Sequence, residues 1–377
     1  MQKFTPVLLI LLLLIVTGCS DNKTPNPNPN PNEDNLIEQL QQNNALLEKY
    51  GQQQDVISYP FSQAYLTKRH ELYQQLKKQG VNNYSADQLD YLIIEERFAE
   101  RFFMWPPYAA VISNWLTLRE RNAELSVAET EQVELTQWIL LAQKTLMQRY
   151  DEKLILDKIH LHRLQYEIKQ SISQFKRAFI NPTAVNVALI QSLEGFADYL
   201  SNYRARNSLA LSQQPNGASW YQAKLNYYGN TVKSPAQWFN ATTQTLSALG
   251  ITVLPKGTLP AKIFHDDRLL NNWFLELFPI TSRSKGLDWR HSYVDIVSTL
   301  SQSEQSKVTP QLHFVAAVLA QVDIGIHYQV WTQQHARNVL QTQLGLDSIS
   351  ADKIIEYTVL YPGVLLSPFA LNSSVTF

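Results

Sequence analysis

Residues 312–327 have the sequence LHFVAAVLAQVDIGIH. If this segment is one helix, Leu312, Leu319 and Asp323 share a face, because residues three or four apart are neighbours on a helix. His327 follows Asp323 by four residues, so the two side chains are expected to meet there. A carboxylate on an apolar face needs a partner, since an unpaired buried charge is costly. The segment therefore predicts a buried helix that carries an Asp–His pair.

Two interpretations of Asp323 and His327 remain open. In the first, His327 is an oriented acid/base group or a ligand, and the pair is catalytic. In the second, the pair is structural and joins helices. Gly325 lies between them and costs about 1 kcal/mol in a helix. It indicates that another backbone packs closely against this point.

The composition favours helices and a sizeable core. The chain has 377 residues, of which 45% are hydrophobic and only 12 are Gly. This favours an all-α fold, a multi-helix array with at most a short β-hairpin or extended segment near residues 251–260. The formal net charge is −1, which gives no basic footprint for nucleic acid.

The N-terminus has the pattern of a secretory signal. Residues 1–18 contain Lys3 and a ten-residue apolar run, which is shorter than the roughly 20 residues of a spanning helix. Val16-Thr17-Gly18-Cys19 resembles the bacterial lipobox, in which the Cys is lipidated after cleavage; an ordinary signal peptide is the alternative. The resemblance implies a lipid anchor at Cys19 in the cell envelope. Ser20, where an Asp would retain the protein in the inner membrane, implies the outer membrane, facing the periplasm.

Residues 19–35 form a tether rich in Asn and Pro. Its alternating Asn-Pro tract is extended and, at about 3.1 Å per residue, would hold a globule roughly 30 Å from the lipid. Residues 36–377 are the helical domain, which we expect to divide into an N-terminal bundle (36–210) and a C-terminal part (211–377).

Apolar stripes and capping signals place helices along this domain. Helices are expected at residues 36–50, 61–78, 155–179 and 185–210, and one apolar stripe comprises Leu135, Trp138, Ile139, Ala142 and Leu146. Ser234 and Gln237 form a capping box with Pro235 at the first helical position. His160 and His162 point about 200° apart on a helix, so they are not expected to share a metal ion.

The motifs of the second half resemble, in order, a bacterial family known as domain of unknown function 885. They are Pro215-Asn216-Gly217, the helix start at Ser234, Val322–His327 followed by Val330-Trp331-Thr332, and Tyr361-Pro362-Gly363. Members of this family are large helical proteins similar to HExxH zinc peptidases. The resemblance implies a helical fold and a metallopeptidase-like ancestry.

The zinc motif that the resemblance implies is absent from the chain. Residues 246–311 occupy its place and contain His265 and His291 without HExxH spacing. Val364 stands where the family has a Gln, and Glu356-Tyr357 stands near the place of an Arg-Tyr pair. The chain therefore resembles a truncated member that has lost its metal, a pseudo-enzyme without a cofactor.

We expect a non-catalytic envelope lipoprotein with a binding or scaffolding role in the periplasm. Its partners would be the membrane, through the lipid, and a peptide or protein ligand. The alternative is a hydrolase, with metal-free acid/base chemistry at His327 or a rebuilt metal site. The weak candidates for such a metal site are His265, Asp266, Asp267 and His291.

Overall fold

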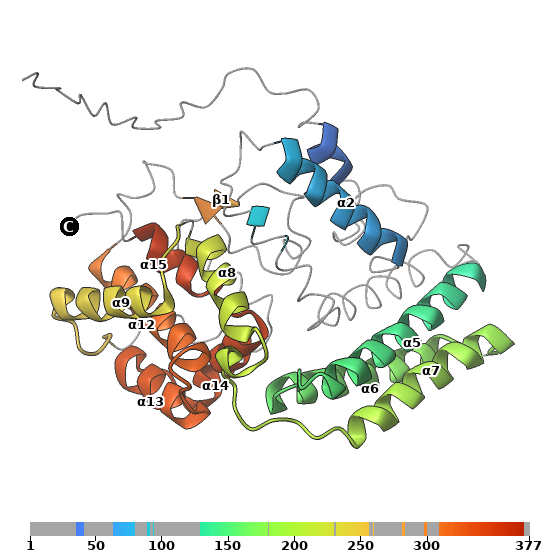
Figure 1. Cartoon of the computed structure of the whole chain (residues 1–377). Helices are drawn as coiled ribbons and strands as arrows, with labels where there is room; N and C mark the ends of the chain where they lie inside the picture. The colour runs from blue at the N-terminus through green and yellow to red at the C-terminus, as the bar shows by residue number, and fades with distance from the viewer. Residues whose placement is uncertain are drawn as a thin grey trace, which may run out of the picture.

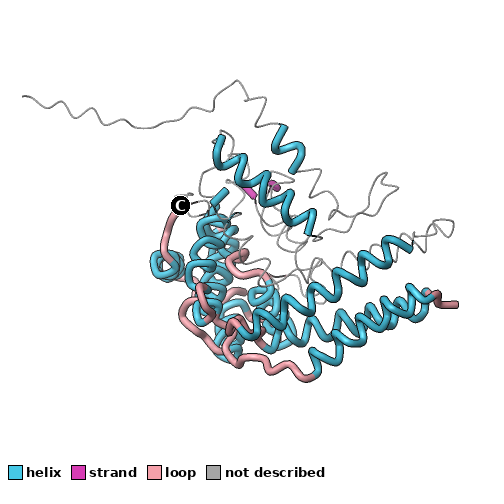
Figure 2. Tube along the Cα trace, turned by 45° about the vertical axis from the view of Figure 1, so that its right-hand side comes forward, coloured by secondary structure: helices cyan, strands magenta, loops and turns pink. Residues whose placement is uncertain are grey.

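The computed structural model describes residues 35–40, 63–79, 89–90, 93, 129–179, 181–229, 231–255, 259, 281–282, 298–299 and 309–372. Most of these residues are helical, and Figures 1 and 2 show them as packed helices joined by loops. The predicted all-α class is confirmed. The strands within the described ranges are the two-residue antiparallel pair β1 (Thr281–Ser282) and β2 (Ser298–Thr299).

The helices follow one another in chain order. After a short helix at residues 35–40 come α2 (Gln63–Gln79), α5 (Glu129–Asp151), α6 (Lys158–Ala178), α7 (Ala184–Ser201), α8 (Gly217–Gly229), α9 (Pro235–Leu249), α12 (Pro310–His327), α13 (Gln333–Leu344), α14 (Ser348–Leu360) and α15 (Leu366–Asn372). A 3-10 turn, η1 (Leu211–Gln213), precedes α8.

The first core lies among α5, α6 and α7. Helix α7 packs against both α5 and α6, and the three run side by side in Figure 1. Four residues of the predicted apolar stripe, Leu135, Trp138, Ile139 and Ala142, are buried there, and Leu146 packs against them. The stripe was thus correctly predicted to face a core.

The second core surrounds α12. This helix packs against α9, α13, α14 and α15, and 14 of its 18 residues are buried. The same apolar cluster includes Leu40, Leu72 and Tyr221, so it joins residues from both ends of the described chain. The division of the domain near residue 210 stays a prediction.

One prediction about secondary structure was wrong in detail. The helix expected at residues 185–210 ends at Ser201, because the following loop pairs with residues 155–157 instead. The backbone N–H of Arg206 donates to the Leu156 carbonyl over 2.9 Å. The segment near residues 251–260, for which at most a short hairpin or an extended segment was expected, has no regular secondary structure within 251–255, where the Leu254 N–H donates to the Gln343 carbonyl over 2.8 Å. Cys19 and most of the tether lie outside the described residues.

Candidate functional site

Helix α12 positions both candidate residues. It begins after Thr309, whose hydroxyl accepts from the Leu312 N–H over 3.2 Å, and Pro310 occupies a first-turn position. It ends at His327, where the chain turns and the Trp331 N–H donates to the Gly325 carbonyl over 2.9 Å. The predicted helix is therefore present, and its C-terminal turn carries Asp323 and His327 into the second core.

The Asp323 carboxylate is fully buried and accepts hydrogen bonds from two other segments. The Tyr221 hydroxyl on α8 donates to Oδ1 over 2.7 Å. The Gly363 N–H donates to both oxygens over 3.0 Å, and the Leu365 N–H to Oδ2 over 3.4 Å. One side chain thus ties α12 to α8 and to the turn between α14 and α15.

His327 is also buried, with 1% of its surface exposed. Its Nε2 lies 3.0 Å from the Thr358 carbonyl on α14, and its ring is centred 5.2 Å from the Tyr221 ring. Because a carbonyl only accepts, Nε2 carries the proton in this arrangement. Its Nδ1 has no hydrogen-bond partner among the residues that the structure describes.

Asp323 and His327 do not hydrogen-bond to each other, so the expected direct pair was wrong. The carboxylate is turned toward the Gly363 turn, and the imidazole is turned toward α14. Tyr221 contacts both of them and lies between the two groups in the network. Residues four apart on one face can thus have separate partners when other helices supply better ones.

Burial dominates the acid–base properties of this network. It raises the pKa of Asp323 to about 7, although the hydrogen bonds from Tyr221, Gly363 and Leu365 and the charge of Lys224 act to lower it. Burial lowers the pKa of His327 to about 3, and burial next to Asp323 raises the pKa of Tyr221 well above its usual value. At neutral pH His327 is therefore uncharged, and Asp323 is balanced between its two forms.

Two glycines fit this network closely. A Cβ on Gly325 would lie 2.4 Å from ring atoms of Trp331, so the neighbour is an indole ring and not the backbone that was expected. Gly363 has a φ of 86°, a backbone conformation that glycine adopts readily, and presents its N–H to Asp323. The sequence predicted that another part of the chain packs closely against Gly325, but it did not identify the Trp331 ring as that part.

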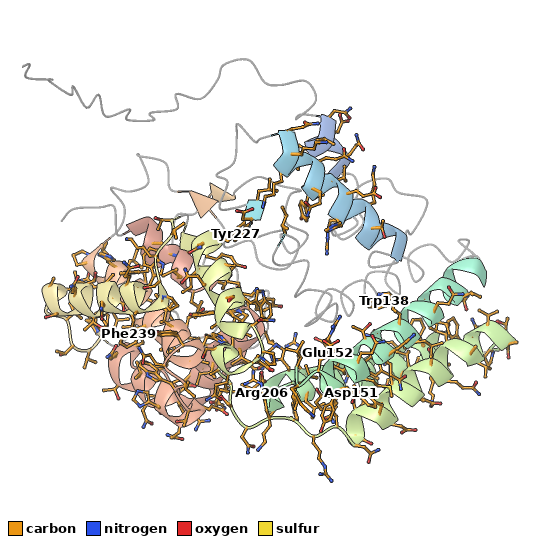
Figure 3. All side chains as sticks on the ribbon, viewed as in Figure 1. Trp138, Asp151, Glu152, Arg206, Tyr227 and Phe239 are labelled. Carbon is orange, nitrogen blue, oxygen red and sulfur yellow. The ribbon has the colours of Figure 1, made fainter. Side chains whose placement is uncertain are left out.

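A second polar cluster lies where the first core meets the second. Asp157 is the N-cap of α6 and accepts from the Ile159 and His160 amides, and its Oδ2 is 2.8 Å from His160 Nδ1. The Arg206 guanidinium approaches Asp157 to 3.4 Å and donates to the carbonyls of Ile155, Ser208 and Ala210. Figure 3 shows Arg206 at this junction, near the end of α5.

The pKa of Asp157 is lowered from its usual value. Burial opposes this shift, but the neighbouring His160 and Arg206 favour the charged carboxylate. His160 is mostly buried by this contact, whereas His162 is exposed on the opposite side of α6. The two histidines thus lie apart, as their spacing predicts.

The remaining predicted site residues lie outside the described part of the chain. These are His265, Asp266, Asp267 and His291, together with Cys19. Within the described ranges, no group of three or more His, Cys, Asp or Glu side chains could hold a metal ion. No helix in those ranges is both long and apolar enough to cross a membrane.

Sequence reasoning missed Tyr221, Lys224 and Arg206 as partners of the buried charges. Lys224 is 2% exposed, and its ammonium lies 4.5 Å from the centre of the Trp220 ring. Tyr221 and Asp323 are 102 residues apart in the chain, so no local pattern links them. A signal was present in α8, where Lys224 lies among aromatic residues.

No protein-family model matches the chain, and no curated protein matches it. Among solved structures, "the putative lipoprotein from Colwellia psychrerythraea" aligns with 90% of this chain and 91% of its own length, at 13% identity and a TM-score of 0.46. A likeness of that size carries no conclusion about function. The resemblance to domain of unknown function 885 therefore stays a prediction.

Proposed function

We propose that the chain is a lipid-anchored, helical protein of the bacterial envelope that binds or scaffolds other molecules and does not catalyse hydrolysis. The lipobox-like Val16-Thr17-Gly18-Cys19 supports the anchor. The all-α fold, with two apolar cores, supports a folded body that could bind a partner.

One observation supports the non-catalytic part of the proposal. The Asp323 carboxylate is 0% exposed, and its hydrogen bonds are made to groups inside the fold. Its donors are backbone amides and a buried tyrosine hydroxyl. A catalytic group must reach the atoms of a substrate. Asp323 instead fixes the Gly363 turn, and His327 contacts the Thr358 carbonyl.

The finer proposal is that the chain descends from the zinc-peptidase-like family and has lost its metal. Val364, at the position of the family's Gln, is fully buried beside the turn that Asp323 holds. An amide there would need a polar partner in the core, so the apolar residue favours a packing role. This supports a site converted from chemistry to structure.

The decisive experiment measures zinc and peptide hydrolysis on tag-free mature protein, purified without chelator and dialysed against trace zinc. We expect no stoichiometric zinc and no hydrolysis. About one tightly bound zinc per chain, whose removal abolishes a hydrolytic activity, would establish the hydrolase instead. Metal-free hydrolysis that disappears in a folded His327→Gln variant would establish acid/base chemistry at that residue.

A further inference from the structure

The outer face of α6 is exposed to solvent. It comprises Lys158, His162, Tyr166, Lys169, Ser173 and Arg177, which recur every three or four residues and so lie on one side of the helix; we call it the α6 face. Tyr166, at its centre, is 58% exposed. The opposite side of α6 buries Leu164, Ile168 and Phe175 in the first core, so this face points away from the fold.

The α6 face is positively charged and carries no acid. The other two cations of the helix form ion pairs, Arg163 with Glu167 and Glu356, and Lys176 with Glu194.

Lys158, Lys169 and Arg177 form no ion pair with any residue that the structure describes. The whole chain has a formal net charge of −1, so this positive charge is a local feature. A surface of this kind is complementary to an anionic one.

Tyr166 favours a lipid surface over a soluble anionic partner. Tyrosine has an apolar ring with a polar tip and is enriched at the headgroup level of membranes. The ring is exposed between Lys158 and Lys169 along the helix, where a flat layer of anionic headgroups could contact all three side chains. Because the apolar side of α6 is already buried in the core, contact would be electrostatic with a shallow aromatic insertion.

We propose that the α6 face docks on a phospholipid surface that contains anionic headgroups. The role rests on the proposed lipid anchor, which would hold the protein close to such a surface. The tether of residues 19–35, which is expected to hold the body roughly 30 Å from the lipid, would not itself fix an orientation. Docking through α6 would give the anchored body one orientation.

The test measures co-sedimentation of the lipid-free polypeptide from Ser20 to the C-terminus with vesicles at low salt. One set of vesicles contains phosphatidylglycerol and the other only phosphatidylcholine. The variant on the face is Lys158→Glu/Lys169→Glu/Arg177→Glu. The matched control, Lys68→Glu/Lys78→Glu/Lys144→Glu, makes the same charge change at exposed residues on α2 and α5.

We expect binding to anionic vesicles only, and its loss at high salt. Each cation near an anionic membrane raises the binding affinity about fivefold. The triple variant of the α6 face should therefore bind at least about a hundredfold more weakly. The control variant should retain most of the binding, and Tyr166→Ser should weaken it severalfold. Circular dichroism would verify that each variant is folded.

Three results would overturn the proposal: no binding of the wild type at low salt, equal binding to both vesicles, or equal loss in both triple variants. A wild type that ignores vesicles but binds an acidic protein through this face would assign the face to that partner class. Palmitate labelling of Cys19 tests the anchor separately, so failure of docking and failure of anchoring remain distinguishable.

Discussion

At the scale of single residues, Asp323 connects the elements of the second core. It joins three segments of the chain by hydrogen bonds, although a carboxylate in a core is costly without partners. Removing it would leave the Tyr221 hydroxyl and the Gly363 and Leu365 amides buried without acceptors. Each unsatisfied buried donor costs about 1–3 kcal/mol.

We therefore expect Asp323→Ala to lower the free energy of unfolding by about 3 kcal/mol or more. A double-mutant cycle with Tyr221→Phe should show a coupling of about 1 kcal/mol or more, because the two side chains share a hydrogen bond. Urea unfolding measures both quantities. A control cycle with Leu135→Ala in the first core should be additive within about 0.5 kcal/mol. Additivity in the Tyr221 cycle would show that this hydrogen bond does not contribute.

The pH dependence of stability should reveal two opposing groups. Asp323 has a folded pKa raised to about 7. Its contribution to the free energy of unfolding is therefore greatest at acid pH and is lost as the pH rises through 7. His327 has a folded pKa lowered to about 3, so its contribution is greatest above its unfolded value of about 6.5 and is lost as the pH falls. Between about pH 4 and 6.5 the two effects should largely cancel.

Single variants should separate the two effects, measured as the difference in unfolding free energy from the wild type at each pH. With Asp323→Asn, stability should fall relative to the wild type as the pH drops from about 6.5 to 4, by up to about 1.4 kcal/mol per pH unit. With His327→Gln, relative stability should rise over the same range. Parallel curves for all three proteins would mean that neither pKa is shifted by folding.

At the scale of elements, α12 and the turn after it are fitted to one another through Gly325. The Trp331 ring packs where a Cβ would lie, and it also contacts His335 and Phe239 edge-on. The turn includes Val330 with a φ of 60°, which is strained for a β-branched residue.

Gly325→Ala should destabilise the protein by about 1–3 kcal/mol, since its methyl group would overlap the Trp331 ring. The matched control is Gly195→Ala on α7, where a Cβ would meet nothing within 4 Å. That change should stabilise the helix by up to about 1 kcal/mol. Chemical denaturation of both variants tests the pair, and equal effects of the two changes would contradict the close packing at Gly325.

Helices could be predicted where the residues that determine them lie close together in the sequence. The Ser234 capping box and the apolar stripe of α5 depend on residues three or four apart, and both are present as predicted. The end of α7 was not predictable, because the Leu156 N–H that donates to the Tyr203 hydroxyl lies 47 residues away. The partners of Asp323 were hidden for the same reason, since Gly363 is 40 residues distant.

At the scale of the whole molecule, polar contacts join the two cores. Arg206 and Gln214 hold the Ile155 backbone between them, and Arg163 reaches Glu356 on α14. These contacts hold the first core, which carries the exposed α6 face, against the second core. The orientation of the body then depends on what lies outside it, namely the tether and the proposed lipid.

The proposed location of the molecule depends on Cys19, which is the only cysteine in the sequence. If the lipobox-like segment directs lipidation of that thiol, as proposed, cells grown with labelled palmitate should yield a labelled protein in the membrane fraction. Cys19→Ala should abolish the label and leave the uncleaved precursor, whereas Ser20→Ala should keep the label. Ser20→Asp should move the labelled protein to the inner membrane if the sorting rule applies. Because Cys19 is the only cysteine, palmitate label that the Cys19→Ala protein retains would contradict the lipoprotein interpretation.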